Sequence, residues 1–204
     1  MTQQSTDPPR RTRLSREARG TQLLDVAEAL FAERGFEGVS MEDIARTAGV
    51  TRPMVYVHHG TKDQIFLACA RRARAELDAA ISDPEALAQA GASVDEVIER
   101  AGTVFFAILE RDPRRWLVLF NPSASLSEDL AAELRAMRDR TIARIARMTS
   151  PFAPFDDDRN TAFAYAISGV GEQLGRWWIA NPDVPVSQVV GYYRDFITTG
   201  LRTS

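Results

Sequence analysis

The chain has 204 residues, of which 45% are hydrophobic and 26% charged, with one cysteine and a formal net charge of −3. Its apolar runs, such as residues 116–120, fall far below the roughly 20 residues of a membrane-spanning helix, and one cysteine excludes an intramolecular disulfide framework. Residues 1–20 hold no apolar block that would indicate a secretory signal peptide. We therefore expect a globular protein of one or two domains in the cytoplasm.

The charge is distributed unevenly along the chain. Residues 1–20 carry five arginines and two acidic side chains, a net charge of +3, whereas residues 1–62 together carry +1 and residues 63–204 carry −4. The acidic total by itself argues against a nucleic-acid partner. Because the positive charge gathers near the N-terminus, a contact with a polyanion is expected there.

Residues 1–14 are predicted to form a flexible basic arm, because they contain two adjacent prolines and show no apolar periodicity. Arg10, Arg11 and Arg13 either contact a DNA minor groove and its phosphates or belong to a solvated tail, and the sequence favours neither. From this arm to the C-terminus the apolar spacing is helical, without the alternation typical of strands. The predicted fold class is therefore all-α.

Apolar stripes and capping boxes predict about nine helices. The first stripe runs from Leu23 to Phe31, and its helix ends at Gly35. Later stripes lie within residues 65–81, 94–108, 126–148, 163–177 and 189–201. The capping-box pattern, a Ser or Thr followed three residues later by an acidic residue or Gln, predicts helix starts at Ser40, Thr61, Ser82, Ser93 and Ser125.

Residues 40–62 have the features of a helix-turn-helix. Ser40 caps a short helix, and Gly49 supplies a turn geometry that a side chain would resist. Thr51 can cap the next helix, which has Pro53 in its first turn, where a missing N–H costs nothing. The inner face of the first helix is formed by Met41, Ile44, Ala45 and Ala48. Two short helices joined by such a turn form this motif, and the second of them enters the DNA major groove.

The sequence around this motif resembles the tetracycline-repressor (TetR) family of transcriptional regulators over roughly residues 17–77. The resemblance is carried by Phe31-Ala32-Glu33-Arg34-Gly35-Phe36, Ile44-Ala45, Ala48-Gly49-Val50, Tyr56, His58 and Lys62-Asp63. It implies a three-helix DNA-binding domain over residues 15–62 and a helical ligand-binding and dimerisation domain over residues 63–204. In the family, the last two helices pair with those of a second copy as a four-helix bundle.

The resemblance also assigns the DNA contacts. The residues implied to face base edges are Thr51, Arg52, Pro53, Met54 and Val57. Those implied to hold the DNA backbone are Tyr56, His58 and Lys62, with Ser40 at a helix N-terminus that can meet a phosphate. Arg52 is the best candidate for direct readout, because a guanidinium can bridge O6 and N7 of guanine for about 1–3 kcal/mol of discrimination.

His59 departs from the family pattern, which usually has a large apolar residue, most often Phe, at this position. We favour a packing role beneath the recognition helix; the alternative is a pH-sensitive contact, since histidine titrates near neutrality. The His58-His59 pair has no acidic or cysteine partner nearby in sequence, so we expect no metal site. No cofactor is expected either.

The C-terminal helices are expected to supply a ligand chamber and a dimer interface. The candidate ligand contacts are Phe105, Phe106, Leu109, Trp116, Phe120, Met137, Tyr165, Glu172 and Trp177. Each one taken singly is more typical of an ordinary core; the excess of aromatic side chains favours a pocket. Glycines at positions 169, 171 and 175 suggest a close helix approach in the dimer. Arginines 71, 72, 74, 135, 138, 140, 144 and 147 are interpreted as solvated faces, and Cys69 as buried.

We therefore predict a homodimeric regulator of transcription that binds a palindromic operator, with repression and release by a small hydrophobic effector as the favoured hypothesis. The alternative is a DNA-binding regulator without such a ligand, controlled by a protein partner or by its own abundance. An enzyme is not expected, because the only two histidines lie in the DNA-binding segment and there is no phosphate loop or zinc motif.

Overall fold

The computed structural model describes residues 14–120, 126–152 and 155–202. Over these residues the chain is all-α, as predicted. The helices are α1 (Arg16–Arg34), α2 (Met41–Ala48), α3 (Arg52–His59), α4 (Lys62–Gln89), α5 (Val94–Arg111), α6 (Pro113–Phe120), α7 (Glu128–Thr149), α8 (Asp157–Ile179) and α9 (Val186–Arg202), with a 3-10 turn at Ser150–Phe152. Within the described ranges none of these helices is long and apolar enough to cross a bilayer.

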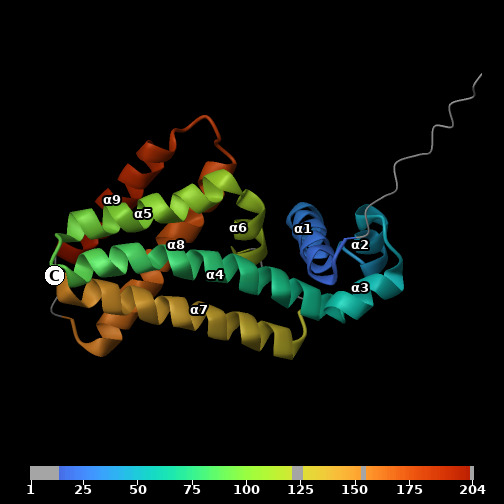
Figure 1. The fold of residues 1–204 in the computed structure, drawn as a ribbon. Coiled ribbons are helices and arrows are strands. Elements are labelled where there is room, and N and C mark those ends of the chain that lie inside the picture. The colour runs from blue at the N-terminus through green and yellow to red at the C-terminus, as the bar shows by residue number, and fades with distance from the viewer. Residues whose placement is uncertain (1–13, 121–125, 153–154, 203–204) are drawn as a thin grey trace, which may run out of the picture.

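The helices form two packed groups that share α4 (Figure 1). The helices α1, α2 and α3 lie at one end, while α5, α8 and α9 lie at the other, and α4 runs between the two groups beside α7. The first half of α4 supplies Ile65 and Phe66 to the core around α1–α3, and its second half supplies Leu77 and Ile81 to the other core. A division of the chain after residue 62 stays a prediction, because one continuous helix serves both cores.

Helix starts follow local sequence where side chains close the capping box. Ser40, Thr61 and Ser93 each accept a hydrogen bond from the backbone N–H three residues on, as predicted. Ser125 lies outside the described residues, and the cap of α7 is Ser127, which accepts from the backbone N–H of Leu130 at 3.3 Å.

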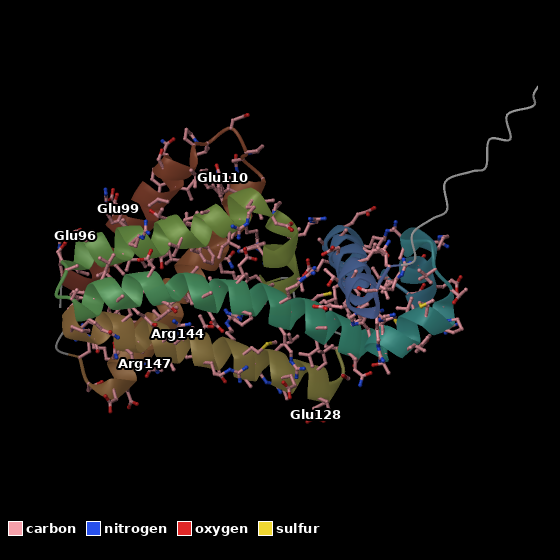
Figure 2. All side chains as sticks on the ribbon, in the orientation of Figure 1. Glu96, Glu99, Glu110, Glu128, Arg144 and Arg147 are labelled. Atoms are coloured by element: carbon pink, nitrogen blue, oxygen red, sulfur yellow. The ribbon has the colours of Figure 1, made fainter. Side chains whose placement is uncertain are left out.

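The helix start predicted at Ser82 is wrong, because α4 continues through this position to Gln89. Arg144 of α7, labelled in Figure 2 beside α4, donates to Ser82 Oγ at 3.0 Å and to Glu85 Oε1 at 2.9 Å. Pro84 and Ile81 are buried on the same stretch. Tertiary contacts on both sides of Ser82 therefore outweigh a local capping signal.

The small residues of α8 make room for side chains of the same chain. A Cβ added at Gly175 would lie 2.7 Å from Leu109 Cδ2 and 2.9 Å from Trp116 Nε1. At Gly171 the nearest atoms belong to Phe105 and Tyr193, at 3.5 Å. At these two positions the close approach is made within one chain, to α5, α6 and α9, which corrects the expectation that they serve the dimer; for Gly169, where no such neighbour lies within 4 Å, a role in the dimer stays a prediction.

Candidate DNA-binding face and effector cavity

The turn between α2 and α3 has the geometry that its sequence predicts. Gly49 is in the left-handed region, at φ 65° and ψ 37°, and the backbone N–H of Val50 donates to the carbonyl of Ala45 at 3.0 Å. Ala45 is buried, and its small side chain allows the two helices to approach closely. The turn therefore sets the angle at which α3 leaves the body.

One side chain, Val55, anchors α3, since it is the residue of this helix that is fully buried. Five other residues of α3 are exposed: Arg52, Pro53, Met54, Tyr56 and Val57. Val57 is 69% exposed, which is unusual for a large apolar side chain. Thr51 is the N-cap, and its side chain makes no capping bond to the described residues. All of the residues predicted to face bases are therefore exposed, and their contact with DNA stays a prediction.

Arg52 is held in place by the next turn of its own helix. Its Nη2 donates to the hydroxyl of Tyr56 at 3.1 Å, and its Cζ lies 5.5 Å from the centre of the Tyr56 ring. This hydrogen bond is the largest cause of a pKa that is raised above the usual arginine value, so the side chain stays charged. The exposed guanidinium is thus oriented before any partner arrives.

Two further groups lie beside this surface, where α2 and α4 begin. Lys62 is the first residue of α4, and its Nζ lies 4.2 Å from the centre of the Phe36 ring. Ser40 caps α2, and its backbone N–H donates to Asp43 Oδ2 at 3.0 Å. Hydrogen bonds from Ser40 lower the pKa of Asp43, so a charged carboxylate already lies at the N-terminus of α2. A phosphate at this end must approach beside a negative charge.

The two histidines at the end of α3 face α1. His59 Nε2 lies 3.0 Å from the carbonyl oxygen of Gly20, within hydrogen-bond distance, which supports the packing role. His58 lies close to the same glycine, and its pKa is lowered below 6.5, first by partial burial and then by His59 and Arg16. In the free protein His58 is therefore mainly neutral at pH 7.

The interior of the body holds two hollows that share a wall. The larger, of about 240 Å³, lies between α4, α6 and α7, and the smaller, of about 50 Å³, lies between α4, α5, α7 and α8. Arg74 and Phe120 line both of them. Ligand pockets ordinarily span about 300–1,000 Å³, so the larger hollow lies just below the lower end of that range and has room only for a small ligand.

The predicted ligand residues divide between this cavity, the core and the surface. Phe105 lines the smaller hollow and Met137 the larger, and Phe120 lines both; Leu109 and Trp116 line a narrow crevice next to them. The others lie elsewhere. Phe106 is buried against Trp178 and Tyr193, Glu172 pairs with Arg138 at 2.8 Å, Tyr165 bonds to Asp139 at 3.1 Å, and Trp177 lies against Tyr192 at the surface.

The sequence interpretation missed three cavity-lining arginines, Arg74, Arg135 and Arg138. Arg74 is only 7% exposed, so its interpretation as part of a solvated face is wrong. Arg72 is also drawn inward, with its Nη2 2.6 Å from Glu28 Oε2. The signal that could have found Arg74 is its spacing, because Phe66 and Ala70 precede it at eight and four residues and point to the same face.

The exposed apolar side chains of the body gather along α8 and α9. Between these two helices lies a groove that is lined by Val170, Gln173, Leu174, Trp177, Tyr192 and Phe196. Phe196 is 67% exposed and Trp177 41%. Contiguous exposed apolar surface of this kind marks a place where another surface packs.

A family model described as "Bacterial regulatory proteins, tetR family" matches residues 23–69, which run from α1 through α2 and α3 into α4. The HTH-type transcriptional regulator TtgR of Pseudomonas putida is 34% identical to this chain, over 94% of each. The chain belongs to the TetR family. It is a DNA-binding transcriptional regulator, and its TetR-family relatives are regulators rather than enzymes.

Two further proteins resemble this chain at lower identity. The HTH-type transcriptional activator FasR of Mycolicibacterium smegmatis is 24% identical over 88% of this chain and 80% of its own. The crystal structure of AibR in complex with isovaleryl coenzyme A and operator DNA has a TM-score of 0.73, covering 87% of this chain and 97% of AibR. Its identity is 18%, so this likeness shows the fold alone.

Proposed function

We propose that this TetR-family protein is a homodimeric repressor that leaves a palindromic operator when a small, largely apolar effector binds in the cavity between α4, α6 and α7. The observation that carries the proposal is the course of α4. It begins at Lys62 beside the recognition helix and reaches the cavity wall at Arg74, about 18 Å further on. A ligand that displaces this wall would tilt the helix that supports α3.

The DNA contacts proposed are those of the open surface on α3 and its neighbours. Base contacts are assigned to Thr51, Arg52, Pro53, Met54 and Val57, and backbone contacts to Ser40, Tyr56, His58 and Lys62. Arg52 supports this assignment best, because it is exposed, charged and oriented by Tyr56. We propose in addition that residues 1–13, which lie outside the described ranges, add phosphate contacts through Arg10, Arg11 and Arg13.

The groove along α8 and α9 is the proposed dimer interface. Two copies joined there would present two recognition helices, and half-sites about 34 Å apart would place both in successive major grooves. The effector must bind with different affinity to the two arrangements of the recognition helices, the one that fits the operator and the one that does not. Coupling free energies of this kind are typically 1–3 kcal/mol. We also propose that the protein acts in the cytoplasm, because that compartment holds the DNA that it would bind.

The operator is tested by binding-site selection from random duplexes with the purified full-length chain. We expect palindromic sequences to be enriched, and their affinity, measured by fluorescence anisotropy, to fall when hydrophobic compounds that bind the protein are added. Arg52→Ala serves as the control that should enrich nothing. Enrichment of unrelated single half-sites would contradict the palindrome, and affinity that no bound compound changes would favour the ligand-free alternative.

The direction of regulation is tested with a reporter gene whose promoter contains the selected operator. Repression predicts low expression with the protein and recovery when a bound compound is added. Expression that rises with the protein would instead make it an activator, the role for which FasR is named.

The dimer is tested by Phe196→Glu, which places a charge in the groove. We expect a concentration-dependent shift from dimer to monomer in sedimentation velocity. Tyr165→Glu is the matched control, since Tyr165 is a similarly exposed aromatic residue of α8 outside the groove. Equal dimerisation of the two variants would place the interface elsewhere.

A further inference from the structure

Arg74 is a charged side chain inside the protein whose charge is incompletely matched. It is 7% exposed, and its Nη1 donates to Thr141 Oγ1 at 3.0 Å. Its Nε is buried and has no hydrogen-bond partner among the described residues. No carboxylate of the described chain lies within 4.0 Å of its guanidinium; Asp78, whose charge acts on Arg74 from a greater distance, accepts a hydrogen bond from Thr141 at 3.2 Å.

Other partly buried arginines have carboxylate partners, unlike Arg74. Arg72 contacts Glu28 at 2.6 Å and Asp25 at 2.8 Å. Arg144 contacts Glu85 at 2.6 Å and also lies 3.8 Å from Asp78. Arginine cannot escape burial by losing its proton, because its pKa, although lowered here by desolvation, starts above 12. The unmatched charge of Arg74 is therefore a feature that calls for a partner.

The larger hollow is suited to an anion with an apolar part. Its described charged lining consists of Arg74, Arg135 and Arg138, with no acidic side chain. Arg138 is paired with Glu172, whereas Arg135 makes no ion pair with a described residue. The rest of the wall is apolar, including Phe120, Leu134 and Met137. The hollow thus has a cationic side and an apolar side.

We propose that the effector of this protein is an amphipathic anion, whose carboxylate or phosphate group pairs with Arg74 while its apolar part lies on α6 and α7. The guanidinium fork matches both acid groups. The proposal rests on the effector cavity of the proposed function and adds the chemical class of the ligand. Because Arg74 is on α4, the ion pair would act directly on the helix that begins at Lys62.

The proposal is tested by isothermal titration of the full-length protein, without DNA, with four compounds that have the same eight-carbon chain. We expect octanoate or octyl phosphate to bind at least tenfold more tightly than octanol, and octylammonium to bind more weakly than octanol. The tighter of the two anions identifies the acid group. Equal affinity for octanoate, octyl phosphate and octanol, or binding of none of them, would overturn the proposal.

The residue is tested with Arg74→Gln, which retains a donor toward Thr141 but removes the charge. Affinity for the anion should fall about 10- to 100-fold, while affinity for octanol should not. Arg71→Gln is the matched control, because this arginine lies on the same helix with a 61% exposed side chain. Arg74→Lys keeps the charge and should recover part of the affinity. Unchanged anion binding in folded Arg74→Gln would contradict the proposal.

This test does not depend on DNA, so it separates the two proposals. An anion that binds through Arg74 but leaves operator affinity unchanged would refute its role as an effector, while the assignment of Arg74 as an anion-binding residue would stand. A neutral compound that releases the operator, with no anion bound, would support release and refute the inference.

Discussion

The recognition helix and the effector cavity depart from the usual burial pattern in opposite directions. On α3, Val57 and Met54 place apolar side chains in solvent. In the body, Arg74 places a charge where apolar residues surround it. Most exposed apolar atoms need no explanation, but a large exposed apolar side chain among residues proposed to face DNA and a buried unmatched charge are both informative. Each indicates a surface that a partner completes.

The two regions differ in what builds them. The recognition helix is shaped by neighbours in sequence, since its turn, its cap and its buried anchor lie within residues 49–59. The cavity is assembled from α4, α6 and α7, whose contributing residues lie up to 64 positions apart. Substitutions on α3 should therefore change DNA affinity without changing stability, while substitutions in the body should change stability as well.

The largest expected effect is on DNA binding by the double substitution Arg52→Ala and Tyr56→Ala. It removes a base contact of about 1–3 kcal/mol and its orienting partner at each half-site. We expect operator affinity of the dimer to fall at least a hundredfold in fluorescence anisotropy.

The control is Arg111→Ala, which removes another exposed arginine, at the end of α5 and outside α3. Its operator affinity should match that of the unchanged protein, and all variants should retain the same free energy of unfolding within about 0.5 kcal/mol. Tight operator binding by the double variant would refute the assignment of α3.

In the body the largest expected effect is on stability, by Gly175→Ala. The added methyl group would lie 2.7 Å from Leu109 Cδ2 and close to the indole of Trp116, so the packing of α8 on α5 and α6 must shift. Overpacking of this kind costs about 1–3 kcal/mol, and urea unfolding should show it as a lower midpoint.

Gly169→Ala is the matched control on the same helix. No described atom lies within 4 Å of the added methyl group, so alanine should stabilise α8 by up to about 1 kcal/mol. Two glycine variants that shift the midpoint in the same direction would contradict the packing described for α8.

The sequence is sufficient to predict the DNA-binding segment because its signals are local. Gly49, the capping box at Ser40 and the inner face of Met41, Ile44, Ala45 and Ala48 act over a few residues, and the structure has each of them as predicted. The same local logic misplaces a helix start at Ser82, where Arg144 on α7 holds α4 together. Contacts that arrive from a distant helix are not encoded in the neighbouring residues.

The cavity is less accessible to sequence reasoning for the same reason. Aromatic residues such as Phe105 and Phe120 are recognisable as interior, but their position on a wall rather than in the core depends on how α6 and α7 pack. Arg74 stands in a run of arginines that is typical of a solvated face, and only α6 and α7 bury it. A pattern along one helix cannot show what covers that helix.

A smaller effect is expected from Val57→Ala, which tests whether the exposed apolar surface of α3 serves DNA. The side chain buries little in the free protein, so the free energy of unfolding should change by less than about 0.5 kcal/mol. If its methyl groups are buried on DNA at about 0.8 kcal/mol each, affinity should fall about tenfold for each half-site. Unchanged affinity for the operator would remove Val57 from the contact.

The smallest expected effect is the dependence of DNA binding on pH through His58. Its pKa in the free protein is lowered below 6.5, chiefly by partial burial, whereas a phosphate beside it would favour the charged form. Binding would then take up a proton at each half-site, so operator affinity should rise a few-fold as pH falls from about 7.5 toward 6. Anisotropy titrations across this range measure it.

The matched variant His58→Gln should lose this rise, while His59, which faces the Gly20 carbonyl, remains in both proteins. Stability has the opposite sign: because the folded pKa of His58 is lowered, the unfolded chain takes up a proton first as pH falls below 6.5, and the folded state loses stability. Thermal melts at each pH would therefore show whether a loss of operator affinity at lower pH is caused by unfolding rather than by the DNA contact of His58. An equal pH slope in the two proteins would exclude His58 from the phosphate contact and leave α3 to act through Arg52 and Tyr56.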